Sequence, residues 1–446
     1  MLSAVSYKIY ELRRYLVLSL VISIIAIPLG NVLVIQRDRN RCEMYGEAFW
    51  LYGFAVYNMT DHELVSMLPP EWGFDDGEHV LPDYLGNITY EYPVFGLIFF
   101  AVAVWLFPGV NDLQPLWLNF LLTLVFHLNI VLIALLFGDK IYTTRWVRLF
   151  IAGYYVYGLI TSAGGGKLEP LADCLLLMSL VLRQEGQRNK AMFTLGLAVQ
   201  TKVYPAVAFP LLFIEAPLSS LWFFVSMLLT AIPFLFQGLN LDSLISHILN
   251  TESYSPQIVN TIYPGLAFGT PVIDEHIEYV WPPALIPLVL YVGFMLYTIN
   301  VVLPNAKAFR EPSWKNRLLL LKPLYLYLLP GTLFIFRWVM PWYLFWFGIL
   351  LFLNDTERQS VAFLKLVTIV GLLYAMGLFC NWPYFSTGPL IDFVKHFKLG
   401  LYTFLGLGIM VAIAVTVYAI WRIEITRRDR KGRLIQEAEA RGELII

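Results

Sequence analysis

Long apolar runs recur along the whole chain, and this repetition limits the possible folds more than any other feature of the sequence. Short polar segments interrupt the runs, and several runs approach the roughly 20 residues that a helix needs to cross a bilayer. Of the 446 residues, 58% are hydrophobic and 14% are charged. These values are typical of a membrane protein. We therefore expect an all-α, polytopic chain with about 10–12 transmembrane helices and two external loop regions.

The charged and metal-binding residue types exclude several classes of site. The formal net charge is −1, without the clustered basic face that nucleic-acid binding requires. Cys42, Cys174 and Cys380 lie far apart, and the six histidines lack metal-ligand spacing. The stretch "SAGGGK" lacks the strand and spacing of a phosphate-binding P-loop. We therefore expect no metal, no cofactor and no nucleic-acid partner.

The distribution of Lys and Arg predicts the orientation in the membrane. Short loops rich in these residues stay on the cytoplasmic side. They are the N-terminus, 138–148, 183–190, 304–317 and the tail after Trp421. Two long polar segments, 36–92 and 239–280, should face outward, and the first carries eleven acidic residues against three arginines. Residues 1–422 then form the membrane domain, and 423–446 form a charged cytoplasmic tail.

The order of crossings follows from these assignments. Residues 93–108 should not cross fully, because a crossing there would place the basic loop 138–148 outside. We interpret them as a re-entrant or surface-lying segment. The first crossing is predicted at 15–35, and those after 93–108 are predicted at 115–137, 149–162, 171–182, 191–202, 218–238, 281–303, 318–336, 340–354, 361–382 and 400–421.

The stretch "AVQTKVYPAVAFP" places Lys202 and Pro205 inside an apolar run. Proline breaks a helix, so we predict two short helices that meet at "KVYP" at the outer face. A lysine at the lipid-exposed centre of one helix would cost roughly 2.5–3.5 kcal/mol on insertion scales. It therefore favours a cavity, an interface or an anionic partner, although a lysine that extends to the lipid headgroups is the alternative.

Three carboxylates, Asp38, Glu43 and Glu47, follow the first apolar run closely. A carboxylate at a membrane boundary can act as a general base that removes the proton of an acceptor hydroxyl. Acidic residues in an external segment are also often simply solvated, so their position near the membrane, rather than their number, makes them candidates for catalysis.

Five stretches, read in order, resemble elements of the membrane glycosyltransferases of the GT-C type, which take sugar from a polyprenyl phosphate. The similarity is greatest to the glycosylphosphatidylinositol mannosyltransferase and to bacterial polyprenol-phosphate-mannose enzymes. It lies in "MYGEAFWLYGFAVY", "TYEYPVFG", "GGKLEPL", "KVYPAVAFP" and "RWVMPWYLFW". Each stretch alone is weak evidence for the resemblance, whereas the order and spacing of all five are fairly specific to this family.

The resemblance implies roles for several residues. Glu169 matches the family glutamate of the "GGKLEPL" element, and Lys202 and Arg337 would hold the phosphate of the donor. The aromatic residues expected to line the sugar or the prenyl chain are Tyr92, Tyr204, Trp342 and Tyr343. One departure concerns the base, because Arg41 stands where the family has an aspartate. The base therefore stays open between Asp38 and Glu43, with Glu47 third.

The expected function is transfer of a hexose, with mannose favoured by the resemblance, to a hydroxyl of a lipid or glycan acceptor outside the cytoplasm. The expected partners are the polyprenyl-phosphate sugar, this acceptor and membrane lipids. A cell membrane is favoured over the endoplasmic reticulum as the location. A lipid or sugar-lipid transporter is the alternative function, and a non-catalytic scaffold would explain only the helices.

Overall fold

The computed structural model describes about half of the chain. The described residues are 2–33, 37–74, 79–80, 89–110, 113–138, 147, 151, 154–155, 157–159, 161–235, 272–273, 276–277 and 349. This part is mostly helical, which confirms the predicted helical class. A short antiparallel pair of strands, β1 (Val272–Ile273) and β2 (His276–Ile277), falls within the predicted external segment 239–280.

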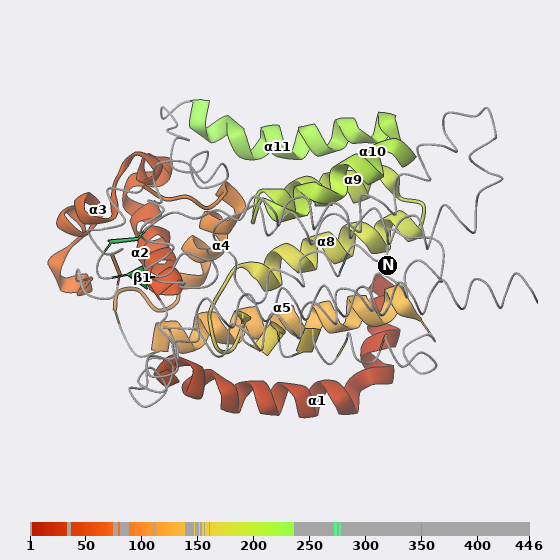
Figure 1. Cartoon of the computed structure of the whole chain (residues 1–446), viewed down its shortest axis with the longest axis horizontal. Coiled ribbons are helices and arrows are strands. Elements are labelled where there is room, and N and C mark those ends of the chain that lie inside the picture. Colours follow the sequence, from red (N-terminus) through yellow and green to blue (C-terminus); the bar gives the residue numbers. More distant parts are fainter. Residues whose placement is uncertain are drawn as a thin grey trace, which may run out of the picture.

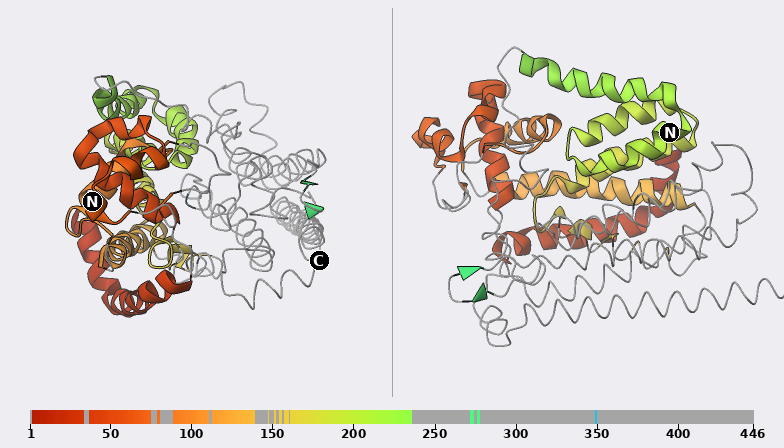
Figure 2. Two further views of the ribbon diagram at one scale, coloured as in Figure 1. Left: turned by 90° about the vertical axis from the view of Figure 1, so that its left-hand side faces the viewer. Right: turned by 45° about the horizontal axis from the view of Figure 1, so that its top comes forward.

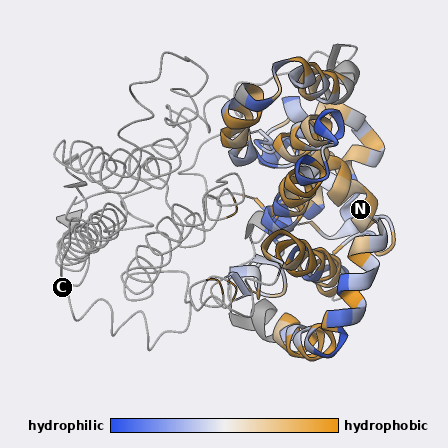
Figure 3. Ribbon diagram, turned by 90° about the vertical axis from the view of Figure 1, so that its right-hand side faces the viewer, coloured by the Kyte–Doolittle hydropathy of each residue, from blue (hydrophilic) through white to orange (hydrophobic). Residues whose placement is uncertain are grey.

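Five helices pack side by side as a bundle, each against the next (Figures 1 and 2). In packing order they are α1 (Leu2–Leu33), α5 (Leu113–Phe137), α8 (Glu169–Gln184), α9 (Arg188–Val199) and α11 (Ser220–Leu235). Viewed along the bundle, the helices are mostly hydrophobic, with hydrophilic residues interspersed (Figure 3). Within the described residues, the apolar runs of the sequence therefore form the helices of this bundle.

Among the described residues, one helix, α5, is long and apolar enough to cross a bilayer. It coincides with the crossing predicted at 115–137. Helix α4 (Val94–Val104) has 11 residues, which span about 16 Å at 1.5 Å per residue and are too few for a crossing. This length agrees with the expectation that 93–108 does not cross. By the same measure α9, with 12 residues, is too short for the crossing predicted at 191–202. Repeated crossing by the whole chain stays a prediction.

The predicted external segment 36–92 is not an open loop, because its described residues fold into short helices beyond one end of the bundle (Figure 1). They are α2 (Arg37–Tyr52), the 3-10 turn η1 (Gly53–Asn58), α3 (Asp61–Met67) and the 3-10 turn η2 (Pro70–Trp72). Helix α3 begins with a capping box, in which the Thr60 side chain accepts from the Glu63 backbone and the Glu63 side chain accepts from the Thr60 backbone.

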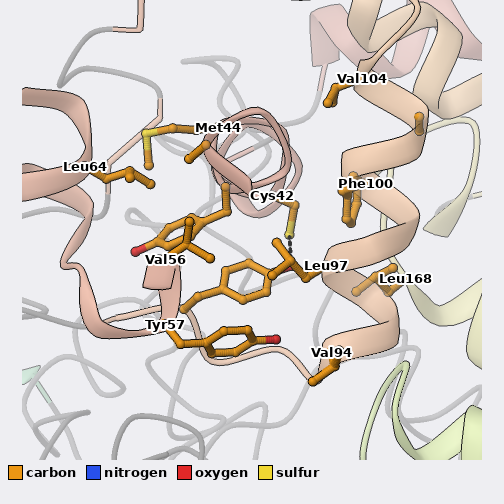
Figure 4. Close-up of a cluster of buried hydrophobic side chains, with 14 of the residues drawn as sticks. Cys42, Met44, Val56, Tyr57, Leu64, Val94, Leu97, Phe100, Val104 and Leu168 are labelled. Carbon is orange, nitrogen blue, oxygen red and sulfur yellow. Dashed lines mark hydrogen bonds between the residues drawn. The ribbon is translucent and has the colours of Figure 1, made fainter. Parts of the chain in front are cut away.

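An apolar core joins this end region to the bundle. Side chains of α2, η1, α3 and α4 converge there, and Leu168 packs against α4 (Figure 4). Among the fully buried members are Met44, Tyr45, Leu64 and Leu97. Because α2 and α4 pack directly on each other, the acidic face of α2 has a fixed position relative to the bundle.

The opposite end of the bundle carries two of the segments predicted to face the cytoplasm, the N-terminus and 183–190. Helix α1 begins there, and the turn between α8 and α9 lies there too (Figure 1). Arg183 at the end of α8 forms an ion pair with Glu215 at 2.6 Å. Residue 215 therefore lies at the end of the bundle where α9 begins, so the chain reverses direction between the start of α9 and residue 215.

The doubling back occurs at "KVYP". Helix α9 ends at Val199, and the 3-10 turn η4 (Tyr204–Ala208) follows, before α10 (Phe209–Glu215) and the 3-10 turn η5 (Pro217–Ser219). The prediction of two short helices that meet at this stretch is confirmed. Pro205 lies in the first turn of η4 and Pro210 in that of α10, where a missing N–H costs least.

Candidate functional site

Helix α2 carries all three predicted acids. Glu43 and Glu47 are one helical turn apart, and each residue is 2% exposed. The backbone of Asp38 lies in the first turn of α2, whereas its side chain lies outside the described residues. The expectation of solvated external acids therefore does not apply to Glu43 and Glu47, which are buried.

Glu43 lies beside a cation on its own helix. Arg39 Nε is 2.9 Å from Glu43 Oε1, and both side chains are buried. Burial raises the pKa of the Glu43 carboxyl to about 7, against the lowering effect of Arg39 and with a further raising effect from Glu47. Glu43 therefore exchanges its proton near neutral pH, the range in which a general base works best.

Glu47 has a different environment. Its Oε1 accepts hydrogen bonds from the Gly109 backbone N–H at 2.6 Å and from Gln114 Nε2 at 2.5 Å. These bonds tie α2 to the turn ahead of α5. Burial raises the pKa of the Glu47 carboxyl, although the bonds from Gln114 and Gly109 oppose the rise. The geometry gives Glu47 a role in holding α2 and favours Glu43 as the base.

Arg41, which occupies the place of the family aspartate, is a structural clamp. Its Nε donates to Asp61 at 2.7 and 2.8 Å, and its Nη1 forms an ion pair with Glu91. Its Nη2 donates to the Thr89 backbone oxygen at 2.9 Å. The Tyr45 hydroxyl also donates to Asp61, at 2.8 Å. Arg41 thus links α2, α3 and residues 89–91, and its positive charge is paired with the carboxylates of Asp61 and Glu91.

A glycine turn brings α2 against the bundle. Gly166 has a φ of +56°, and a Cβ on it would lie 2.5 Å from both Arg39 Cδ and Asn119 Oδ1. Only glycine fits this close approach and this backbone conformation. Asn119 of α5 also donates to the Ala163 backbone oxygen at 3.0 Å. Arg39, the partner of Glu43, therefore packs against the turn that leads, three residues later, to Glu169.

Lys202 and Glu169 form an ion pair at the start of α8. Lys202 Nζ is 2.5 Å from Glu169 Oε1, and the Glu169 side chain is fully buried, while that of Lys202 is 18% exposed. Lys202 Nζ also lies 5.6 Å from the centre of the Tyr92 ring, within cation–π range. The cation is therefore held by a buried carboxylate and a half-buried aromatic ring.

The start of α4 joins the same region. The backbone N–H groups of Phe95 and Gly96 donate to the Gln200 carbonyl at 2.8 and 3.3 Å. A Cβ on Gly96 would lie 2.8 Å from Leu168 Cδ1 and 3.1 Å from the Thr201 oxygen. Glycine therefore lets "TYEYPVFG", "GGKLEPL" and "KVYP" meet at one point.

A buried aspartate that the sequence interpretation missed lies one turn below Glu169. Asp173 is 0% exposed, and its Oδ2 accepts from the Tyr154 and Tyr157 hydroxyls, each at 2.9 Å. Its Oδ1 accepts from the Tyr204 hydroxyl. The signal available in the sequence was an aspartate inside the apolar run 171–182, because an ionisable residue in such a run is a candidate functional residue by default.

The predicted site residues thus divide into two groups. Tyr92, Glu169, Lys202 and Tyr204 lie together, and Arg39, which pairs with Glu43, packs against the adjoining turn. The residues Arg337, Trp342 and Tyr343 lie outside the described part of the chain, as does the tail 423–446. Within the described part, no group of three or more His, Cys, Asp or Glu is placed to hold a metal ion.

Comparisons of the chain with protein-family models, with curated proteins and with solved structures gave no match. The likeness to GT-C glycosyltransferases therefore rests on the five stretches of sequence alone. Four of them, at 44–57, 89–96, 165–171 and 202–210, lie in described parts of the chain. They adjoin one another through apolar packing, backbone hydrogen bonds and the Lys202–Glu169 ion pair.

Proposed function

We propose that this protein is a polytopic membrane glycosyltransferase of the GT-C type. It transfers a hexose, with mannose favoured, from a polyprenyl-phosphate sugar to a hydroxyl of a lipid or glycan acceptor. The reaction takes place on the extracytoplasmic face, in a cell membrane or, alternatively, in the endoplasmic reticulum. The supporting argument is chemical, because the described residues include the two kinds of group that such a transfer requires, a base on α2 and a cation in the turn after α9.

One observation carries the proposal. A buried carboxylate with a pKa near 7, Glu43, is paired with Arg39, and the Arg39 side chain packs against the turn that leads into the Glu169–Lys202 pair. A base that titrates near the working pH suits proton abstraction from a hydroxyl. A fixed cation suits a phosphate leaving group, because it is already oriented when negative charge develops.

The bond changes then follow. Glu43, as the carboxylate, removes the proton of the acceptor hydroxyl while the hydroxyl oxygen attacks the anomeric carbon of the sugar. The bond between this carbon and the phosphate oxygen breaks, and the electron pair leaves with polyprenyl phosphate. Glu43 ends protonated and later releases the proton to solvent. Such a single displacement inverts the configuration at the anomeric carbon, which product analysis can check.

Lys202 has the role of stabilising the phosphate. Its ammonium group carries three N–H donors, and the Glu169 contact orients it. Arg337 is proposed as the second cation, by the resemblance of "RWVMPWYLFW". Tyr92, whose ring lies beside Lys202, together with Tyr204, Trp342 and Tyr343, is proposed to line the sugar or the prenyl chain.

Transport of a lipid or sugar-lipid is the second candidate, because a broken helix with a buried ion pair is also a feature of transporters. The break between α9 and α10, with the Glu169–Lys202 pair beside it, is the observation that favours this alternative. Transport moves the intact donor, whereas transfer cleaves it.

The test is to incubate the purified chain in lipid nanodiscs with polyprenyl-phosphate mannose and an extract of native lipid acceptors. Release of polyprenyl phosphate, dependent on the acceptor and lost in Glu43→Gln, supports the transferase. Glu63→Gln is the matched control, since Glu63 is an exposed cap of α3 in the same segment. Intact donor in every reaction, together with movement of donor across liposomes, would support transport instead.

A further inference from the structure

We propose that Asp173 is a positioning residue, which fixes Lys202 through the Tyr204 hydroxyl. The effect on catalysis rests on the proposed function, whereas the effect on the position of Lys202 depends only on how the "KVYP" turn is held. Asp173 lies on α8, four residues after Glu169, so both carboxylates are on one face of the helix. Glu169 binds Lys202, and Asp173 binds Tyr204, two residues further along the same turn.

The turn needs such support because the helical hydrogen bonds end there. Helix α9 stops at Val199, and the last backbone bonds run from Lys202 and Thr201 to the Ala198 oxygen, both at 3.1 Å. The next described bond begins η4, from Ala206 to the Val203 oxygen at 2.9 Å. Between these two backbone bonds, the side chains of Lys202 and Tyr204 connect the turn to Glu169 and Asp173, on consecutive turns of α8.

The burial of Asp173 is costly unless hydrogen bonds compensate for it. Three tyrosine hydroxyls supply that compensation: Tyr154, Tyr157 and Tyr204, all of them buried. Apolar residues often replace buried charged groups in a core without loss of stability, so stability alone does not require this cluster. Of the three tyrosines, only Tyr204 is close to Lys202 in the chain, two positions after it. Its hydrogen bond to Asp173 can therefore also hold the turn that carries Lys202.

This difference supplies a matched pair of variants. Tyr204→Phe and Tyr157→Phe each remove one hydroxyl that donates a hydrogen bond to Asp173, so two tyrosine donors remain in each variant. Only Tyr204→Phe cuts the link to the turn of Lys202. A structural role for the cluster predicts equal effects, whereas the positioning role predicts unequal ones.

The experiment measures the rate at which a sulfonated N-hydroxysuccinimide acetate acetylates Lys202 in the full chain, by mass spectrometry at fixed pH. Lys190, exposed at the other end of the bundle, is the internal reference. We expect Asp173→Asn and Tyr204→Phe to raise the Lys202 rate about tenfold, the effect of one hydrogen bond to a charged group. Tyr157→Phe should change it less than about twofold, with the Lys190 rate constant throughout.

Equal acceleration by Tyr157→Phe and Tyr204→Phe, or no acceleration by either, would overturn the inference. Should Asp173→Asn fail to fold, the tyrosine pair still decides. The same variants are then assayed for kcat with polyprenyl-phosphate mannose, where Tyr204→Phe should lower kcat about tenfold and Tyr157→Phe should not. If the labelling pattern holds but the wild-type chain never cleaves the donor, the proposed function fails while the positioning of Lys202 by Asp173 stands.

Discussion

Lys202 and Glu169 meet at 2.5 Å although 33 positions separate them in the chain. The contact joins the start of α8 to the break after α9. It also places a cation beside a fully buried carboxylate, so the removal of either side chain takes an opposite charge away from the other.

The first prediction separates stability from catalysis at this pair. Lys202→Ala should lower kcat about 10²-fold, because it removes a cation from the leaving phosphate. It should also lower the apparent melting temperature, since Glu169 is left buried without its partner. The double variant Lys202→Ala/Glu169→Gln should recover the melting temperature but not kcat.

Lys202→Arg should restore part of kcat, because it keeps the charge with a different shape. Lys190→Ala is the control for a lost exposed lysine. If Lys202→Ala retains full turnover, the phosphate role is wrong. Non-additive losses with Arg337→Ala in a double-mutant cycle would support a phosphate shared by both cations.

The second prediction concerns the base. Glu43→Gln should lower turnover by about 10²–10⁴-fold while donor binding changes little. Glu47→Gln should chiefly lower stability, because Glu47 accepts from Gly109 and Gln114. Asp38→Asn completes the set. Full activity in all three variants would place the base elsewhere.

The third prediction concerns pH. Because the pKa of Glu43 is about 7, kcat/KM should rise through this pH as Glu43 loses its proton and then level off. The folded-state pKa is raised, so the contribution of Glu43 to stability is greatest below its ordinary pKa and is lost as pH rises through about 7. Thermal scans from acidic to mildly basic pH should therefore show a smaller decline in Glu43→Gln than in wild type.

The fourth prediction tests the contact between α2 and the glycine turn. Gly166→Ala places a Cβ 2.5 Å from Arg39 Cδ, in addition to the strain of a positive φ. Gly138→Ala is a close control, because Gly138 has a φ of +54° but nothing within 4 Å of its Cβ position. Gly166→Ala should lower both stability and turnover, and Gly138→Ala should lower stability slightly, by about 1 kcal/mol. Equal effects would contradict the close approach.

The fifth prediction tests orientation. In a cysteine-free background, an impermeant thiol reagent should label Glu71→Cys in intact cells and label Glu185→Cys only after permeabilisation. Both positions are exposed, and they lie in the acidic end region and in the basic turn between α8 and α9, respectively. Thr143→Cys, outside the described residues, should behave like Glu185→Cys. Labelling of position 143 from outside would reverse the proposed topology.

The helical class and the break at "KVYP" were predictable, because both depend on residues close together in the chain. Apolar runs of helical length are local signals, and so is Pro205, which follows Lys202 by three residues. The prediction that 93–108 does not cross fully came from the basic residues of 138–148, and the short length of α4 agrees with it.

The environment of each acid was not predictable from the sequence. Glu43 and Glu47 are equally acidic and one turn apart, yet Glu43 lies beside Arg39 while Glu47 binds Gly109 and Gln114. The Glu47 partners are 62 and 67 residues away in the chain, so no local pattern could separate the two carboxylates.

The sequence by itself determined that the chain is helical, that its charges are sorted between segments, and that a lysine interrupts an apolar run. The tertiary structure alone decided that Lys202 binds Glu169, that Arg41 joins Asp61 to Glu91, and that Asp173 accepts three tyrosine hydroxyls. The physical reason is that helix formation follows local periodicity, whereas the partner of a buried charge is chosen by packing between distant segments, where an unpaired charge would be too costly to bury.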